Sequence, residues 1–146
     1  MPSPDLSFAT TLLVRDTCLC LHAQRAARAL ARRFDEAFRP LGLTSGQFSL
    51  MMALNRPQPA SMGPVAALLA LDRTTLTAAL KPLERRGLVR VSPDPRDRRA
   101  RLLSLTEEGG ALLARALPIW QATHAEAEQR LRGEAAALRQ ALATLA

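Results

Sequence analysis

The sequence lacks the features of several common protein classes. Two of its 146 residues are cysteine, Cys18 and Cys20, which is too few for a disulfide-stapled secreted domain. No stretch approaches the roughly eighteen apolar residues of a membrane span, and the N-terminal MPSPDLSF has neither the basic start nor the apolar run of a signal peptide. We therefore expect a soluble, cytoplasmic protein.

Motifs of enzymes and of metal sites are also missing. The chain has no phosphate-binding glycine loop, no G-x-S-x-G, no H-E-x-x-H and no dinucleotide fingerprint. His22 and Cys18 share a helical i, i+4 spacing, but two ligands do not make a zinc site, which needs three or four, and the chain has no dense Cys, His or Glu cluster to supply the rest, even with His124 elsewhere. We predict no catalysis, no metal and no cofactor.

What the chain does have is apolar content and positive charge. With 48% hydrophobic residues, residues 1–146 are expected to form a single domain with its own core. The formal net charge is +7 and the pI is near 11.3, which favours a polyanionic partner such as nucleic acid. The basic residues are nearly all arginine, and we weigh their position more than their number.

Hydrophobic periodicity predicts long amphipathic helices at both ends of the chain. One runs from about Thr11 to Phe38, where Pro40 and Gly42 stop it; on it, Cys18 and Cys20 face away from each other and cannot bridge. At the other end, Thr106 caps a helix that runs to about Leu131 with a kink at Pro118, Gly133 breaks it, and a last helix spans Glu134 to Leu145.

The central part predicts shorter elements. Thr44 with Gln47 forms a capping-box signature, and Ser61 and Asp72 are expected to cap two short helices, Gly63 to Leu69 and Arg73 to about Arg86. The turn between these two is only Ala70 and Leu71, which fits a helix-turn-helix. Alternation in 89–91 and 101–105 predicts a β-hairpin with the charged loop SPDPRDRRA between its strands.

Positive charge concentrates beside the predicted helix-turn-helix. From Lys81 to Arg101 there are eight basic and three acidic residues. Phosphate contacts supply non-specific affinity for DNA, and a helix in the major groove can place Arg, Thr and Lys against base edges. We expect sequence-specific DNA binding. The competing hypothesis, a helical adaptor or a non-specific nucleic-acid-binding protein, uses the same charge only as an electrostatic surface.

Two stretches carry a resemblance to a known family. The run LDRTTLTAALKPLERRGLV, followed by DPRDRRARLLSLTEEG, resembles the recognition helix and wing of the MarR family of bacterial regulators. Asp97 and Arg99 form its D-x-R wing motif, and Leu105 and Thr106 form the LT pair that opens the next helix, with Gly109 close behind. The resemblance extends from about Cys18 to Leu145.

The resemblance implies a mainly α-helical fold with a small β-hairpin wing. Residues 43–106 would form the winged helix-turn-helix, and residues 11–39 and 107–146 would form the dimerisation helices of a homodimer on a pseudo-palindromic operator. By the family pattern the recognition helix faces the major groove, and Arg99, oriented by Asp97, enters the minor groove. The expected DNA-binding residues are Asp72, Arg73, Thr74, Thr75, Thr77, Lys81, Arg86, Asp97, Arg98, Arg99 and Arg101.

The signal is predicted in two alternative forms. The family implies a repressor that leaves its operator on binding a small aromatic or phenolic ligand, and the expected pocket residues are Leu19, Leu21, Phe34, Phe38, Phe48, Met51 and Met52. In the hydroperoxide-sensing OhrR branch a reactive cysteine matches Cys20, so oxidation there is the alternative. That branch holds its cysteine with tyrosines, and this sequence has none.

Overall fold

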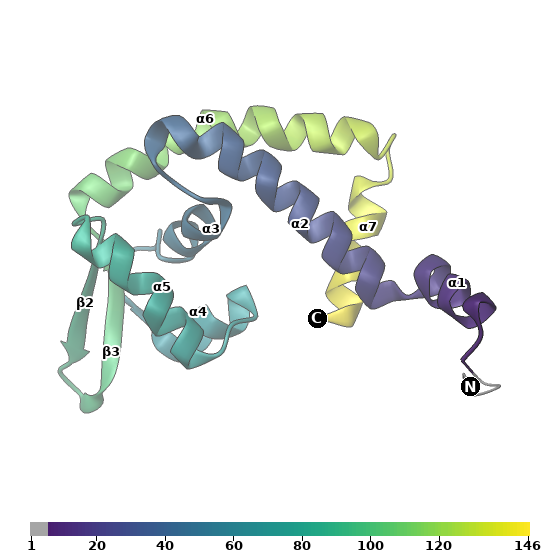
Figure 1. Cartoon of the computed structure of the whole chain (residues 1–146). Helices are drawn as coiled ribbons and strands as arrows, with labels where there is room; N and C mark the ends of the chain where they lie inside the picture. The colour runs from purple at the N-terminus through teal and green to yellow at the C-terminus, as the bar shows by residue number, and fades with distance from the viewer. Residues whose placement is uncertain (1–5) are drawn as a thin grey trace.

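The computed structural model describes residues 6–146. The first five residues, part of the N-terminal segment compared above with signal peptides, lie outside the described residues. The described chain is mostly helical with one small antiparallel sheet, as expected (Figure 1). The elements in chain order are α1 (Phe8–Thr17), α2 (Leu19–Phe38), the 3-10 turn η1 (Arg39–Leu41), α3 (Ser45–Ala53), β1 (Ala60–Ser61), α4 (Met62–Leu69), α5 (Arg73–Arg85), β2 (Val89–Asp94), β3 (Asp97–Leu105), α6 (Glu107–Arg130) and α7 (Ala135–Leu145).

The helix predicted for residues 11–38 is in fact two helices, so that prediction was wrong. Cys18 has φ −68° and ψ 110°, which ends α1, and its Sγ accepts the Leu21 N–H at 3.4 Å as the N-cap of α2. Cys18 therefore precedes the helix that carries Cys20, and the two do not face away from each other on one helix. Because a cysteine is an unusual cap and the apolar residues continue through the break, periodicity did not reveal it.

The helices at the centre begin where their caps predict. Thr44 and Gln47 form both bonds of the capping box at the start of α3, each at 3.1 Å. Ser61 is the N-cap of α4, but its side chain makes no capping hydrogen bond. Ala70 takes up a left-handed conformation, φ 53°, in the turn from α4 to α5, which costs energy for a residue with a Cβ.

The hairpin is longer than predicted and has a third strand beside it. β2 and β3 pair from Val89 with Leu105 out to Asp94 with Asp97, so most of the predicted loop is strand and only residues 95–96 form the turn. Pro93 is tolerated because β2 is an edge strand. β1, which sequence reasoning missed, pairs with the other side of β3 through Ala60 and Leu103. Two residues are too short for a periodic signal.

The C-terminal helices follow the prediction to within one residue at each end. Thr106 caps α6 by accepting the Gly109 N–H at 3.0 Å, and Pro118 lies inside one continuous helix. Gly133 has φ 92° at the break before α7. α2 packs against α6, and the two helices spread apart toward α7; we call this pair the stalk (Figure 1).

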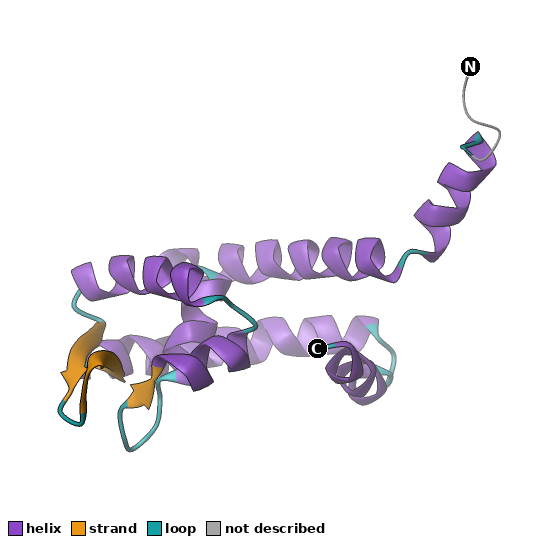
Figure 2. Ribbon diagram, turned by 90° about the horizontal axis from the view of Figure 1, so that it is seen from below, coloured by secondary structure: helices purple, strands orange, loops and turns teal. Residues whose placement is uncertain are grey.

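The core lies at one end of the stalk, where α2 and α6 pack against the part from α3 to β3 that we call the head. Its members share less than 9% exposure: Phe38, Leu43, Phe48, Leu50, Met51, Ala53, Leu54, Ala60, Val65, Ala66, Leu76, Leu80, Leu83, Leu88, Val89, Leu103, Leu113 and Ala116. α1 and α7 contribute none of these residues, and α1 projects away from the rest of the described chain (Figure 2). Within residues 6–146, no helix has the length and apolar character needed to cross a membrane.

Candidate nucleic-acid interface

Helix α5 has one face in the core and one face in solvent. Leu76, Leu80 and Leu83 are buried, so the side chains between them must point outward. The exposed residues include all of those that the sequence predicted on this helix, namely Asp72, Arg73, Thr74, Thr75, Thr77 and Lys81. The start of the helix thus presents hydrogen-bonding groups, and only these, to an outside partner.

Asp72 holds the first turn of α5 in place. Its carboxylate accepts the Thr75 N–H at 2.7 Å and the Thr75 hydroxyl at 3.0 Å. The backbone bond, and then the hydroxyl bond, lower the pKa of Asp72 below its ordinary value because both favour the charged form. The Thr77 hydroxyl donates to the Arg73 carbonyl at 2.8 Å, which leaves Arg73 and Thr74 as the side chains most free to contact a partner.

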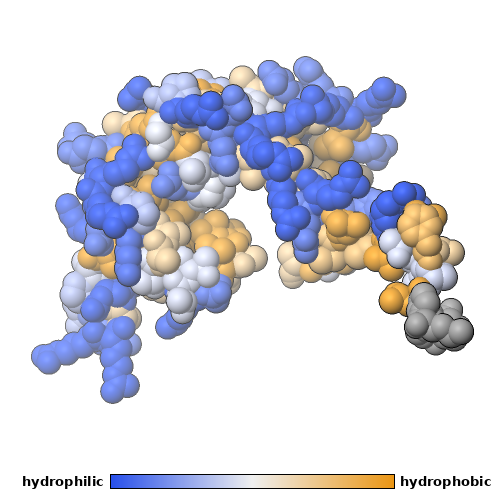
Figure 3. Space-filling model, viewed as in Figure 1, coloured by the Kyte–Doolittle hydropathy of each residue, from blue (hydrophilic) through white to orange (hydrophobic). Residues whose placement is uncertain are grey.

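The wing presents arginines from a tightly bonded tip. The Asp94 carboxylate accepts the Arg96 N–H at 2.9 Å, and the Asp97 carboxylate accepts the Arg99 N–H at 3.0 Å. Asp97 therefore orients Arg99 through the backbone, and the Arg99 guanidinium stays exposed. Hydrophilic side chains extend from this end of the molecule into solvent (Figure 3).

The helix and the wing meet around one small cleft. Thr77 and Lys81 of α5 and Arg101 of β3 line a cavity of about 200 Å³, with Met62, Leu80, Glu84 and Val91 as the other lining residues. Three of the predicted DNA-binding residues are thus brought together, although Arg101 lies twenty or more positions from Thr77 and Lys81 in the chain. Asp97, Arg98 and Arg99 lie farther out, at the hairpin tip.

The cations of this region are not neutralised by the protein. The eight basic residues from Lys81 to Arg101 are all exposed, and among the described residues none of them lies within ion-pair distance of a carboxylate. They are Lys81, Arg85, Arg86, Arg90, Arg96, Arg98, Arg99 and Arg101. A surface with this much uncompensated charge attracts polyanions over a distance of about a Debye length, near 8–10 Å in physiological salt.

Arg86 differs from the other predicted contacts because its guanidinium already has partners. Nη1 donates to the Gly42 carbonyl at 2.7 Å and Nη2 lies 3.4 Å from the Leu41 carbonyl. The sequence offered no signal for this contact, since the partners lie more than forty positions away and use backbone atoms.

The seven residues predicted for an effector pocket do not surround one cavity. Phe38, Phe48 and Met51 are packed in the core, whereas Leu19 is 70% exposed at the far end of α2. Phe34 lines a cavity of about 390 Å³ between α2, α6 and α7, which we call the groove. Its lining is Ala26, Ala29, Leu30, Arg33, Phe34, His124, Ala127, Glu128, Arg130, Leu131, Ala135, Leu138, Arg139 and Leu142.

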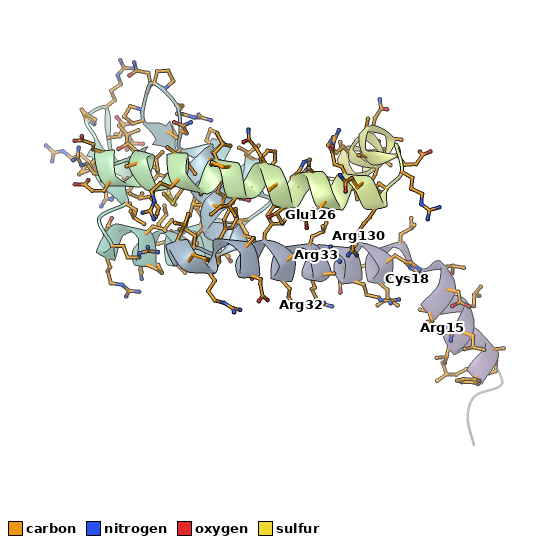
Figure 4. The ribbon with its side chains drawn as sticks, turned by 90° about the horizontal axis from the view of Figure 1, so that it is seen from above. Arg15, Cys18, Arg32, Arg33, Glu126 and Arg130 are labelled. Atoms are coloured by element: carbon orange, nitrogen blue, oxygen red, sulfur yellow. The ribbon has the colours of Figure 1, made fainter. Side chains whose placement is uncertain are left out.

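The groove has an apolar floor and a basic rim. Arg33 of α2 and Arg130 of α6 extend toward each other across the space between the helices, whereas Arg32 points outward (Figure 4). Arg139 is bonded to Glu128 at 2.6 Å, and this bond is the main reason that the pKa of Glu128 is lowered. Arg33 and Arg130 have no ion-pair partner among residues 6–146.

The cysteines and histidines do not form a metal site. Cys20 is exposed and its Sγ accepts the Gln24 Nε2–H at 3.1 Å, and both thiols are free. The His22 ring lies 2.8 Å from the Cys18 carbonyl, and His124 stacks on Trp120 with ring centroids 4.7 Å apart. In the described part of the chain no three metal-binding side chains come together.

Comparison with known proteins identifies relatives of the whole arrangement. A family model described as MarR family matches residues 43–100. The chain is 39% identical over 88 residues to the transcriptional activatory protein BadR of Rhodopseudomonas palustris, covering 58% of this chain and 50% of BadR. It is 41% identical over 76 residues to the transcriptional repressor NicR of Pseudomonas putida, covering 52% and 48%. The chain therefore spans about half the length of these two relatives.

A third relative is matched over more of its length. The transcriptional regulator HosA of Escherichia coli O111:H- is 38% identical over 93 residues, covering 63% of this chain and 68% of HosA. These relatives are named as regulators of transcription and not as enzymes.

Solved structures match nearly the whole chain. The M. tuberculosis regulator MosR in complex with DNA has a TM-score of 0.73 and 37% identity, covering 88% of this chain and 98% of MosR. The repressor CouR bound to a 23-mer DNA duplex has a TM-score of 0.78 and 31% identity, covering 90% and 94%. CouR of Rhodococcus jostii RHA1 bound to p-coumaroyl-CoA has a TM-score of 0.71 and 26% identity, covering 89% and 90%.

Sequence and structure lead to the same relatives. HosA, MosR and CouR are matched at 31–38% identity, and the MosR and CouR structures cover 88–90% of this chain. The chain belongs to the MarR family of winged-helix transcriptional regulators.

Proposed function

We propose that the protein is a homodimeric repressor that binds a pseudo-palindromic operator in double-stranded DNA. The observation that carries the proposal is the set of eight exposed cations next to the exposed face of α5, which have no ion-pair partner within residues 6–146. Phosphate contacts by such cations provide affinity, and a helix with free Arg and Thr side chains provides base contacts. The MosR and CouR structures, both with bound DNA, support the same partner.

Residues are assigned roles by their position. Arg73, Thr74, Thr75 and Thr77, on the exposed start of α5, contact base edges in the major groove, and Asp72 keeps that first turn in order. Arg99 enters the adjacent minor groove from the wing, where a narrow groove attracts a guanidinium. Lys81, Arg98 and Arg101 contact phosphates.

The dimer is proposed from apolar surface outside the head. Large apolar side chains on the terminal helices are 41–75% exposed, and no described element of the same chain covers them. They are Phe8, Leu13, Val14, Leu19, Leu30, Leu138, Leu142 and Leu145. Burial of such a surface by a second copy is strongly favourable, and a symmetric pair spaces two heads for two half-sites. Residues 11–39 and 107–146 would then be dimerisation segments and 43–106 the DNA-binding segment.

The effector is proposed to be a small aromatic or phenolic acid bound in the groove. The apolar floor suits an aromatic ring, and the unpaired Arg33 and Arg130 suit a carboxylate. The CouR structure with p-coumaroyl-CoA supports this ligand class. Leu30, Leu138 and Leu142 line the groove and are partly exposed, so in the proposed dimer the second copy would cover the open side of the groove above a bound ligand. Such a ligand would alter the dimer helices and hence the spacing of the heads.

A second candidate signal is an organic hydroperoxide. The exposed Cys20 thiol is accessible to it and has a hydrogen-bond donor in Gln24. In this reaction the thiolate attacks the peroxide, the O–O bond breaks, Cys20 becomes a sulfenic acid, and the peroxide is reduced to an alcohol.

The function is tested with a duplex selected by the protein from a random-sequence library. Fluorescence anisotropy should show that the selected duplex binds roughly a thousandfold tighter than a scrambled one, and binding to both should weaken with salt. Arg99→Ala should lower affinity for the selected duplex about tenfold or more, because a groove contact is lost. Arg115→Ala, an exposed arginine of α6 outside the head, is the control. Equal binding of the two duplexes by the wild type would contradict sequence-specific recognition.

A further inference from the structure

The C-terminal end of α5 is bonded to both long helices of the molecule. On one side, Arg86 reaches the turn that follows α2, where its guanidinium donates to the carbonyl oxygens of Gly42 and Leu41 at 2.7 and 3.4 Å. These carbonyls lie at the end of the helical run from α2 through η1. Helix C-termini carry partial negative charge, so a cation is favourable there.

On the other side, the residues after Arg86 are bonded to the start of α6. The Thr106 hydroxyl donates to the Gly87 carbonyl at 2.6 Å, and the Thr106 N–H donates to the Leu88 carbonyl at 3.1 Å. Gly109 lies so close to the Leu88 backbone that a Cβ there would overlap the Leu88 carbonyl oxygen. We call these contacts, together with those of Arg86, the junction.

The junction determines how α5 is held relative to the stalk. Gly87 has φ 72° and ends α5, and the Leu88 N–H returns to the Leu83 carbonyl at 2.9 Å, so residues 86–88 are continuous with the last turn of the helix. α2, through the turn after η1, and α6, through its cap Thr106, are therefore both bonded to this one end of α5, and both lead to the groove and to the proposed dimer surface. The base-reading residues lie at the opposite end of α5, where a small tilt is enlarged by the length of the helix.

We infer that Arg86 is a positioning residue for the recognition helix and not a phosphate contact. Its Nη1 and Nη2 atoms are directed at two protein carbonyls, and its packing on Gly42, with Nη2 3.4 Å from where a Cβ would be, fixes the guanidinium against the turn. It acts by tying the end of α5 to the end of α2, which keeps the DNA-reading face in the orientation that the stalk dictates. The inference rests on the proposed DNA binding and reassigns one of its residues.

The two roles differ in how binding depends on salt. Each phosphate contact releases condensed counterions, so removing one lowers the slope of log K against log[salt] by about 0.9 for duplex DNA. Removing a positioning residue leaves the number of phosphate contacts unchanged on the scrambled duplex and lowers only the affinity that depends on a correct fit to bases. The salt slope, together with the ratio of the affinities for the two duplexes, therefore distinguishes a phosphate contact from a positioning residue.

The experiment compares Arg86→Ala, Arg86→Lys and Arg85→Ala in the full chain, on the selected and the scrambled duplex, at four salt concentrations. Arg85 is the matched control, because it is the adjacent exposed arginine and its side chain makes no hydrogen bond or ion pair within the described chain. Arg86→Ala should lower affinity for the selected duplex about tenfold, change affinity for the scrambled duplex less than about threefold, and keep its salt slope there. Arg85→Ala should keep the ratio of the two affinities.

Arg86→Lys keeps the charge but has no planar fork to reach two carbonyls, so it should behave like Arg86→Ala in the specificity ratio. If Arg86→Ala shows no cooperative thermal unfolding, the specificity ratio of Arg86→Lys alone serves as the test. The inference is overturned if Arg86→Lys retains the wild-type ratio, or if Arg86→Ala lowers both affinities alike with a slope reduced by about 0.9. If the wild type itself does not discriminate between the duplexes, the proposed function fails, which is a different result.

Discussion

At the scale of single residues, the start of α6 approaches the segment that follows α5 closely because of one glycine. Gly109 is buried in the first turn of α6, and its Cα faces the backbone of Leu88. Any side chain there would meet main-chain atoms, including the Leu88 carbonyl carbon at 3.0 Å, and a main-chain segment that Thr106 also holds cannot move aside easily. The G of the LTEEG motif is thus explained by packing.

We predict that Gly109→Ala destabilises the fold by about 1–3 kcal/mol, the usual range for overpacking. The matched control is Gly110→Ala, because a Cβ on Gly110 meets nothing within 4 Å and alanine stabilises a helix interior by about 0.5–1 kcal/mol relative to glycine. Urea denaturation at one fixed protein concentration measures both changes. If Gly109→Ala is as stable as Gly110→Ala, the Leu88 main chain moves aside with no loss in the free energy of unfolding.

At the scale of elements, the terminal helices differ from the rest because they have apolar surface but no core. α7 is amphipathic, yet none of its residues is buried, and Arg139 joins it to α6 through Glu128. One exposed ion-pair contact contributes little to stability, and we attribute the exposed leucines of α7 to the proposed dimer contact. α1 projects into solvent with Phe8 75% exposed, and we attribute its exposed apolar side chains to the proposed dimer contact as well.

We predict that Leu142→Glu separates the proposed dimer. Leu142 is 47% exposed and lines the groove, and a carboxylate there would have to be desolvated on association. Sedimentation of the wild type should give twice the monomer mass of 15.8 kDa, and the variant should give the monomer mass.

Gln140→Glu is the matched control, because it adds the same charge on α7 at a position that does not line the groove. It should sediment as the wild type does. If the Leu142→Glu protein keeps the dimer mass, the dimer interface does not include this face of α7.

At the scale of the whole molecule, packed aromatic rings connect the groove with the head. Ring centroids are 4.8 Å apart for Phe38 and Phe48, 6.4 Å for Phe48 and Trp120, and 4.7 Å for Trp120 and His124. His124 lines the groove, whereas Phe48 belongs to α3 and the core of the head. A ligand that displaces the His124 ring has a direct packing route to the head, and coupling of about 1–3 kcal/mol is typical of such a response.

We predict that p-coumarate, used as a representative phenolic acid, releases the selected duplex and that Arg33→Gln weakens this response about tenfold. The reason is that Arg33 faces Arg130 across the groove and would hold the carboxylate. Arg32→Gln is the matched control, since Arg32 points out of the groove. Fluorescence anisotropy against ligand concentration measures the effect.

The same assay with cumene hydroperoxide separates the second candidate signal. Release by the peroxide in the wild type, lost in Cys20→Ser, would assign the signal to the thiol. Release by p-coumarate that is unchanged in Arg33→Gln would place the ligand elsewhere than in the groove.

Much of this protein was determined by local sequence. Thr44, Asp72 and Thr106 cap their helices as predicted, and Gly87 and Gly133 end helices, because capping and left-handed turns depend only on residues within one turn of the chain. The uncompensated charge beside α5 was also visible, since charge is a property of composition. These features were enough to indicate the fold class and a nucleic-acid partner.

The tertiary structure decided what depends on distant parts of the chain. The break at Cys18, the pairing of β1 with β3 and the contact of Arg86 with the Gly42 carbonyl have no periodic or local signal. The predicted pocket residues shared a helical spacing that is equally typical of core, and the structure put Phe38 and Met51 there and left Leu19 exposed. A local sequence pattern predicts which side chains lie on one face of a helix. The residues that they contact are determined by how the helices pack, and packing brings together residues forty or more positions apart.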